Sequence, residues 1–276
     1  PLKFSWPKPE VTGFFSFFYE ALGAFDKPFN QAPSLHVALT VILPAFYFRL
    51  LPKALRLAFA AWSVLVVASV LTTYQHHFID VPLGFLLGLI CLWVWPFDTE
   101  SPLRAWQLTG DSRRRRLAVF YALGALVFAG AGLWGGGAWL WLLWPAFSLG
   151  LVSLAYLGFG PALFAKREDG HMAWPARLML APYLAGAFAN SRLWTLREAK
   201  VVEIAGGVHL GRFPTAGDAA RFGSVVDLTG EFLRPEFAGE WRSVPMLDLV
   251  SPNSRQLRDA ASAITAATWH GPVLVV

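Results

Sequence analysis

From Leu117 to Gly160 the chain reads LAVFYALGALVFAGAGLWGGGAWLWLLWPAFSLGLVSLAYLGFG, without one Asp, Glu, Lys or Arg. A helix needs about 20 mostly apolar residues to cross a bilayer, so this stretch is long enough for two crossings. The three glycines Gly135–Gly137 lie near its middle, where we expect the chain to turn. The stretch therefore predicts a membrane protein built from apolar helices.

Three more apolar stretches precede this one. A soluble protein could bury a single stretch of this kind in its core, but soluble cores rarely supply five in one row. We therefore expect an all-α transmembrane bundle with about five spans. The predicted spans are Val37–Leu51, Leu55–Tyr74, Val81–Phe97, Leu117–Trp134 and Ala138–Leu157.

The composition divides the chain into two parts. Of 276 residues, 55% are hydrophobic and 15% are charged. Residues 1–160 contain 18 charged side chains and residues 161–276 contain 23, so the second part resembles a globular domain. Because the basic excess lies in the apolar part, it indicates cytosolic membrane loops rather than nucleic-acid binding. The single cysteine excludes a disulfide scaffold.

The basic loops predict the orientation of the chain in the membrane. If the five spans alternate, the loops with Lys53 and Arg56, with Arg113–Arg116, and with Lys166 and Arg167 all fall on one side. Loops rich in Lys and Arg face the cytosol. The four consecutive arginines are more typical of such a topology signal than of a binding site. We expect an integral protein of a bacterial cytoplasmic membrane with a cytosolic C-terminal domain.

The apolar stretches, together with the strand and helix patterns that follow them, predict four segments. Short strands with a Gly206-Gly207 turn and one amphipathic helix indicate an α/β domain at the C-terminal end. Its strands are expected at 201–204, 208–210, 224–228, 244–249 and 273–276, with a helix at 257–268. The segments are a membrane core at residues 1–100, two further membrane helices at 101–160, an interfacial linker at 161–199 and a partial α/β domain at 200–276.

Two short motifs contain the residues that could do chemistry. Pro33-Ser34-Leu35-His36 precedes the first predicted span, and Ser69-Val-Leu-Thr-Thr-Tyr-Gln-His76-His77-Phe-Ile-Asp80-Val81 connects the second to the third. His36 and His76 are 40 residues apart, which corresponds to two membrane crossings, so both return to the same side. Asp80 follows His76 by four residues, one helical turn, where a carboxylate fixes the imidazole tautomer.

These motifs resemble the type 2 phosphatidic acid phosphatase superfamily of membrane phosphatases and phosphotransferases. The resemblance implies that His76 is the nucleophile that forms a phosphohistidine, Asp80 orients it and His36 protonates the leaving oxygen. It also implies phosphate binding by Ser34 and by Lys8 and Lys3, which stand near the position of the family's first basic motif. No metal or other cofactor is implied. The resemblance covers about residues 1–97 and places the site on the extracytoplasmic side.

One departure from the family pattern leaves the reaction open. Val70 follows Ser69 where the family has an arginine, and Thr72-Thr73-Tyr74 precedes the histidines. Here the chain looks more like inositol phosphorylceramide and sphingomyelin synthases, which pass a phosphorylated head group to an alcohol. We expect a lipid-phosphate phosphatase, with head-group phosphotransferase as the alternative. A non-catalytic transporter or receptor is the alternative of another class, but it would place ionisable residues nearer the bilayer midplane.

The C-terminal part resembles the first half of a dual-specificity protein phosphatase. The resemblance lies in Glu203–Pro214, in Val225–Thr229, in Pro245–Leu249 and in the strand Gly271–Val276. It implies a second, phosphorylated substrate in the cytosol and Asp248 as a general-acid candidate. In that family a catalytic Cys follows the last of these strands, and Cys91 cannot replace it because it lies in a span. We therefore expect the chain to be a fragment, cut both before its first motif and before that Cys.

Overall fold

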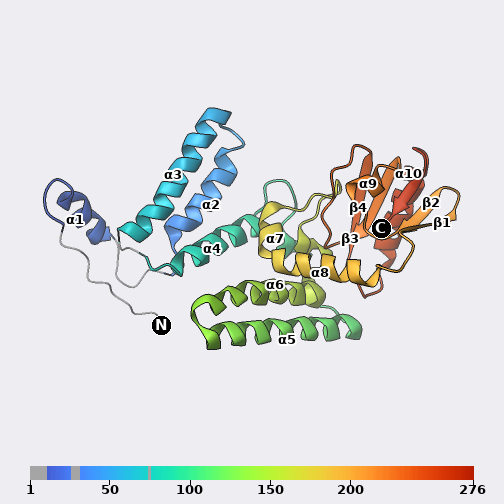
Figure 1. The fold of residues 1–276 in the computed structure, drawn as a ribbon, viewed down its shortest axis with the longest axis horizontal. Helices are drawn as coiled ribbons and strands as arrows, with labels where there is room; N and C mark the ends of the chain where they lie inside the picture. Colours follow the sequence, from blue (N-terminus) through green and yellow to red (C-terminus); the bar gives the residue numbers. More distant parts are fainter. Residues whose placement is uncertain (1–10, 26–31, 74–75) are drawn as a thin grey trace. The chain divides into compact units, whose positions relative to one another are not determined.

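The computed structural model describes residues 11–25, 32–73 and 76–276, which form two compact units, Pro1–Leu92 and Trp93–Val276 (Figure 1). Lys3 and Lys8, predicted to bind phosphate, lie outside the described residues. The N-terminal region is helical, and the C-terminal region contains a mixed sheet.

The first unit consists of helices. Its members are α1 (Ser16–Phe25), α2 (Leu35–Tyr47), α3 (Lys53–Thr72) and α4 (Asp80–Val94), the last of which runs into the second unit. Helices α2 and α3 lie side by side as a hairpin (Figure 1). Helix α4 begins at Asp80 and packs closely on the start of α2 through its glycines. A Cβ atom on Gly84 would lie 2.4 Å from the Ser34 carbonyl oxygen, closer than any contact allows.

The second unit begins with a helical hairpin. Helix α5 (Ser112–Gly135) ends at the predicted glycine turn, where Gly136 and Gly137 both have positive φ. The chain returns antiparallel to α5 through η2 (Gly137–Leu142), α6 (Leu143–Leu154), the π-helical η3 (Ala155–Phe159) and η4 (Gly160–Phe164) (Figure 1). The short η1 (Pro102–Ala105) precedes α5.

Three helical segments are long and apolar enough to cross a membrane, among the residues described. They are Lys53–Thr72, Ser112–Gly135 and Gly137–Phe164. The first and third of the five predicted spans form helices of only 13 and 15 residues, α2 and α4. Pro96 explains the end of α4 at Val94, because it disfavours the helical conformation at Trp95. Helix α2 ends at Tyr47, four residues before Leu51. These long apolar helices are consistent with a membrane protein.

Residues 161–199 have more regular structure than the predicted linker. Helices α7 (Trp174–Met179) and α8 (Ala181–Trp194) follow a tight hairpin in which Lys166 and Met172 form a β-bridge. The Trp144 indole donates a hydrogen bond to the Leu178 carbonyl at 3.1 Å, which joins this segment to α6.

The C-terminal sheet has five strands in the order β1-β2-β5-β3-β4. Strands β1 (Val201–Ala205) and β2 (Val208–Gly211) pair antiparallel, whereas β2, β5 (Val273–Val275), β3 (Ser224–Thr229) and β4 (Glu240–Met246) are parallel. Helix α9 (Ala216–Ala219) is short, and α10 (Ser254–Thr268) buries three alanines, Ala260, Ala263 and Ala267. The fourth predicted strand, 244–249, is wrong in its second half, because β4 ends at Met246 and Asp248 lies in the following turn.

Candidate active site

Ser34 connects the first motif to the second. It is fully buried and caps α2, its Oγ accepting a hydrogen bond from the Val37 amide at 3.4 Å. A side-chain cap of this kind satisfies one of the free N–H groups at a helix start. The Ser34 amide donates to the Asp80 carbonyl at 3.3 Å. The beginnings of α2 and α4 are therefore joined through their backbones.

This junction brings the two predicted catalytic histidines together. The ring centroids of His36 and His76 are 6.0 Å apart, and the ring planes are inclined by 68°. His36 is exposed, whereas His76 is 9% exposed. One imidazole is thus held in the protein while the other faces the surroundings, and both rings can reach one small anion between them.

Asp80 supports His76 from the protein side. The His76 Nδ1 and Asp80 Oδ2 atoms are 3.4 Å apart, with both side chains almost fully buried. Asp80 Oδ2 also accepts a hydrogen bond from the His77 amide at 2.9 Å. Asp80 is the first residue of α4, where a carboxylate interacts favourably with the positive end of the helix dipole. Its carboxylate can therefore stabilise a positive charge on His76.

The structure also shows the surroundings of Val70, the departure from the family pattern, and of His77, the histidine next to His76. Val70 is 1% exposed, and its carbonyl accepts a hydrogen bond from the His76 amide at 3.0 Å. An apolar side chain is therefore buried where the family has a phosphate-binding arginine. His77 is half-buried and holds Asp80 through its backbone amide, which is a structural contact.

Sequence reasoning missed two residues that make this arrangement possible. Gly84 and Gly88 lie one turn apart on α4, against Ser34 and Val37 and against Ala38 and Val41 respectively. A Cβ on Gly88 would lie 2.7 Å from the Val41 Cβ. The signal was present, since two glycines spaced by four residues in an apolar helix commonly mark a close helix contact.

Asp248, the predicted general acid of the C-terminal part, lies in the second unit. Its side chain is exposed, two residues beyond the end of β4, and its backbone carbonyl accepts a hydrogen bond from the Tyr156 hydroxyl at 2.9 Å. Leu249, which follows, has a positive φ of 62°, a strained conformation for a residue with a side chain.

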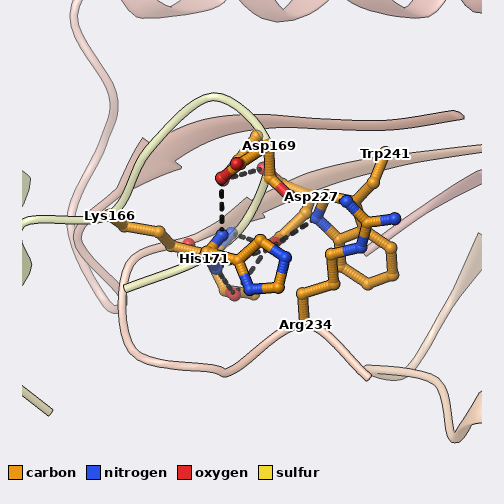
Figure 2. A network of polar contacts seen from close by, with 8 residues as sticks. Lys166, Asp169, His171, Asp227, Arg234 and Trp241 are labelled. Atoms are coloured by element: carbon orange, nitrogen blue, oxygen red, sulfur yellow. Dashed lines mark hydrogen bonds and ion pairs between the residues drawn. The ribbon is translucent and has the colours of Figure 1, made fainter. Parts of the chain in front are cut away.

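A buried polar network lies nearby in the same unit. Lys166 and Asp227 form an ion pair of 2.6 Å, and both side chains are fully buried. The ammonium also donates to the Thr229 carbonyl at 2.8 Å, and the Trp241 indole donates to Asp227 at 3.3 Å. Figure 2 shows the hairpin that carries Lys166, packed against these groups and against Arg234.

Burial shifts the pKa values of two side chains here, Lys166 in the network and Glu231, two residues beyond Thr229. Burial lowers the pKa of Lys166, although the charge of Asp227 opposes this effect. Burial, together with the negative charge of Asp248, raises the pKa of Glu231 to about 7. In the described part of the chain, no three His, Cys, Asp or Glu side chains form a group that could hold a metal ion.

Comparison with known proteins identifies one family. A model described as the PAP2 superfamily matches residues 9–94, which include Ser34, His36, His76 and Asp80. This is the type 2 phosphatidic acid phosphatase superfamily that the two motifs resemble. No match was found among the curated proteins or among the solved structures. The family match supports the assignment of residues 9–94 to the PAP2 superfamily, whose members are typically phosphoesterases.

Proposed function

We propose that the first unit is a membrane lipid-phosphate phosphatase that acts through a phosphohistidine. The observation that carries this proposal is the placement of His36 6.0 Å from His76, with Asp80 directly behind His76. A nucleophile, a group that orients it and a proton donor on the other side of the substrate are the parts that covalent phosphoryl transfer needs. The PAP2 superfamily match supports the same reaction class.

In the proposed mechanism each ring nitrogen of His76 has its own role. Because Nδ1 of His76 faces Asp80, Nε2 is the atom left to attack phosphorus. A bond forms between Nε2 and phosphorus as the ester P–O bond breaks, and His36 donates a proton to the leaving alkoxide. His36 then removes a proton from water, the water oxygen attacks phosphorus, and the P–N bond breaks to release inorganic phosphate. Asp80 balances the positive charge of the phosphoimidazole.

The test uses the full chain in detergent with a lipid labelled with ³²P in its phosphate group. We expect His76→Ala to abolish phosphate release, because no nucleophile remains. His77→Ala is the matched control, and it should keep most of the activity because His77 holds Asp80 through its backbone. Acid-labile label retained on wild type but not on His76→Ala would identify the phosphohistidine. Full turnover by His76→Ala would contradict the mechanism and favour a non-catalytic transporter or receptor.

Head-group transfer is the alternative reaction at the same site. Val70, buried in place of a phosphate-binding arginine, favours it, because the synthases that pass head groups to alcohols also depart from the hydrolases here. The two reactions differ in their second step, in which the group bound to His76 passes either to water or to an alcohol. Product that forms only when an alcohol-bearing lipid is supplied would indicate transfer, and free phosphate without it would indicate hydrolysis.

We further propose that the sheet of the second unit is a phosphatase-like domain on the cytosolic side, with the lipid-phosphate site on the other side. In parallel sheets, ligands bind beyond the carboxyl ends of the strands. Here β5 is the central strand, and Asp248 lies beyond the end of β4 at that same edge. The family match ends at residue 94 and does not include the sheet. Lys166, predicted to be a loop cation, is buried in an ion pair with Asp227, so the proposed orientation rests on the other basic residues, Lys53, Arg56, Arg113–Arg116 and Arg167.

A further inference from the structure

The loops beyond β3 and β4 rest on the end of the helical hairpin in the second unit. The Tyr156 hydroxyl of η3 donates to the Asp248 carbonyl at 2.9 Å. Two residues after the candidate span Gly137–Phe164, Lys166 donates to the Thr229 carbonyl at 2.8 Å. A Cβ on Gly230 would lie 3.3 Å from the ring of Phe164. The carboxyl edge of the sheet is therefore fixed at the level where an apolar helix would leave the membrane.

The four consecutive arginines lie at the same end of this hairpin. They form the first turn of α5, and the Arg114 guanidinium donates to the Ala155 carbonyl at 3.3 Å, next to Tyr156. Farther along α5, Tyr121 stacks on Tyr156 with ring centroids 5.4 Å apart. Tyr156 thus contacts α5 on one side and the Asp248 loop on the other. The basic first turn of α5 and the carboxyl edge of the sheet are neighbours in one unit.

The arginines are available to bind an anion. Arg113, Arg115 and Arg116 are exposed. Nε of Arg114 is buried without a hydrogen-bond acceptor among the described residues. A buried donor without an acceptor is costly, so such a group commonly marks the place of an ion or ligand. The carboxylates of Asp248 and Glu231 belong to the loops at the sheet edge and would repel an anion, so the attraction comes from the guanidinium groups of α5.

We propose that Arg113–Arg116, together with the edge formed by the Thr229–Glu231 and Leu247–Leu249 loops, binds the phosphate monoester of an anionic membrane lipid. A cluster of basic residues directly beside a membrane helix is the common signature of anionic lipid binding. A lipid phosphate reaches this level within the bilayer surface, whereas a phosphorylated protein would have to approach between the sheet and the head groups. The second unit thus takes a lipid ligand, and its turnover of that lipid rests on the phosphatase-like function proposed above.

The experiment uses the full chain with His76→Ala, reconstituted in phosphatidylcholine nanodiscs. A photoactivatable phosphatidic acid, added as a minor component, is cross-linked, and the labelled peptides are mapped. The comparison probe is photoactivatable phosphatidylserine, which is anionic but has no phosphate monoester. We expect phosphatidic acid to label residues near 113–116 or within the two loops, in addition to any labelling around His36.

Two double variants each remove two positive charges, one at the proposed site and one elsewhere in the second unit. Arg113→Gln with Arg115→Gln removes two exposed cations at the site, and Arg255→Gln with Arg258→Gln removes two from α10. At about fivefold in affinity per cation near a membrane surface, the first pair should reduce labelling roughly 25-fold and the second should leave it unchanged. Arg114→Lys should retain more labelling than Arg114→Gln.

Three results would overturn the proposal. One is equal labelling by phosphatidic acid and phosphatidylserine, which would indicate only nonspecific attraction to anionic lipid. The others are labelling unaffected by the Arg113/Arg115 variant, and displacement of the lipid by a soluble phosphopeptide. Release of phosphate from a small aryl phosphate is measured separately, with a His76→Ala protein that continues past Val276 through the Cys that the resemblance implies. Absence of that release would contradict the phosphatase-like function, while the labelling would still decide the lipid site.

Discussion

The two units hold their buried ionisable pairs in different ways. In the first unit, His76 and Asp80 are 3.4 Å apart, and Nδ1 of His76 has no hydrogen-bond acceptor in good geometry among the described residues. In the second unit, Lys166 and Asp227 are 2.6 Å apart, and three further hydrogen bonds from Thr229 and Trp241 surround Asp227. The first pair is placed by backbone contacts between helices, and the second by side chains that saturate one another.

This difference is the one that the proposed mechanism requires between a reactive pair, His76 and Asp80, and a structural pair, Lys166 and Asp227. A nucleophilic imidazole must keep one nitrogen available and change its charge during the reaction, so a loosely held partner suits it. An ammonium that only joins a hairpin to a sheet is stabilised by every extra bond. The comparison predicts that loss of the Lys166–Asp227 pair mainly lowers stability, whereas loss of the His76–Asp80 pair mainly lowers turnover.

Lys166→Met should have the largest effect, a loss of about 3–5 kcal/mol in the free energy of unfolding of the second unit. Removal of one partner of a buried ion pair leaves the other charge without compensation. Arg167→Met is the matched control, because the neighbouring Arg167–Asp169 pair is largely exposed, and it should cost less than about 1 kcal/mol. Pulse proteolysis of the full chain in urea and detergent measures both values.

Equal losses for the two variants would contradict the difference between a buried and an exposed pair. In that case the hairpin would be held mainly by its backbone, through contacts such as the bond from the Ser243 amide to the Glu168 carbonyl.

Glu231 should make the stability of the second unit depend on pH. With a folded-state pKa of about 7, against 4.5 for the free side chain, the folded state keeps a proton that the unfolded state has lost. The free energy of unfolding should therefore fall as the pH rises from about 4.5 to about 7, by about 3 kcal/mol in total. Glu231→Gln should remove this decrease, and the exposed Glu236→Gln should retain it. The thermal midpoint across this pH range measures the effect.

The sequence predicted the parts of this architecture that depend on local pattern. The apolar run from Leu117 to Gly160 gave a helical hairpin with its turn at the glycines. The 40-residue spacing predicted that His36 and His76 return to the same side of the membrane, and in the structure their rings are 6.0 Å apart. Both predictions use a single physical rule, the length of an apolar helix, which needs no knowledge of partners.

Contacts between distant segments could not be predicted in this way. Lys166 followed an apolar span, and nothing local indicated that its charge would be neutralised by Asp227, 61 residues later. Helices α2 and α4 end sooner than their apolar stretches do, and only for α4 does a proline, Pro96, stand directly at the end. Gly84 appeared to be one more small residue in a span, and only the structure shows the backbone that it meets.

Gly84→Ala provides the last test of the comparison, since it alters the backbone contact that places the reactive pair. The added Cβ would lie 2.4 Å from the Ser34 carbonyl, so α2 and α4 must separate, and His36 moves away from His76. A displacement of about 1 Å can cost roughly 100-fold in rate, about 2.7 kcal/mol in activation free energy.

Gly130→Ala on α5 is the control, because its Cβ would meet no atom within 4 Å. Gly88→Ala should destabilise the same helix contact one turn farther from the histidines, with a smaller loss of kcat. If Gly84→Ala lowered only the thermal midpoint and left kcat unchanged, the approach of the two backbones would serve packing alone, and the histidines would be positioned by some other contact.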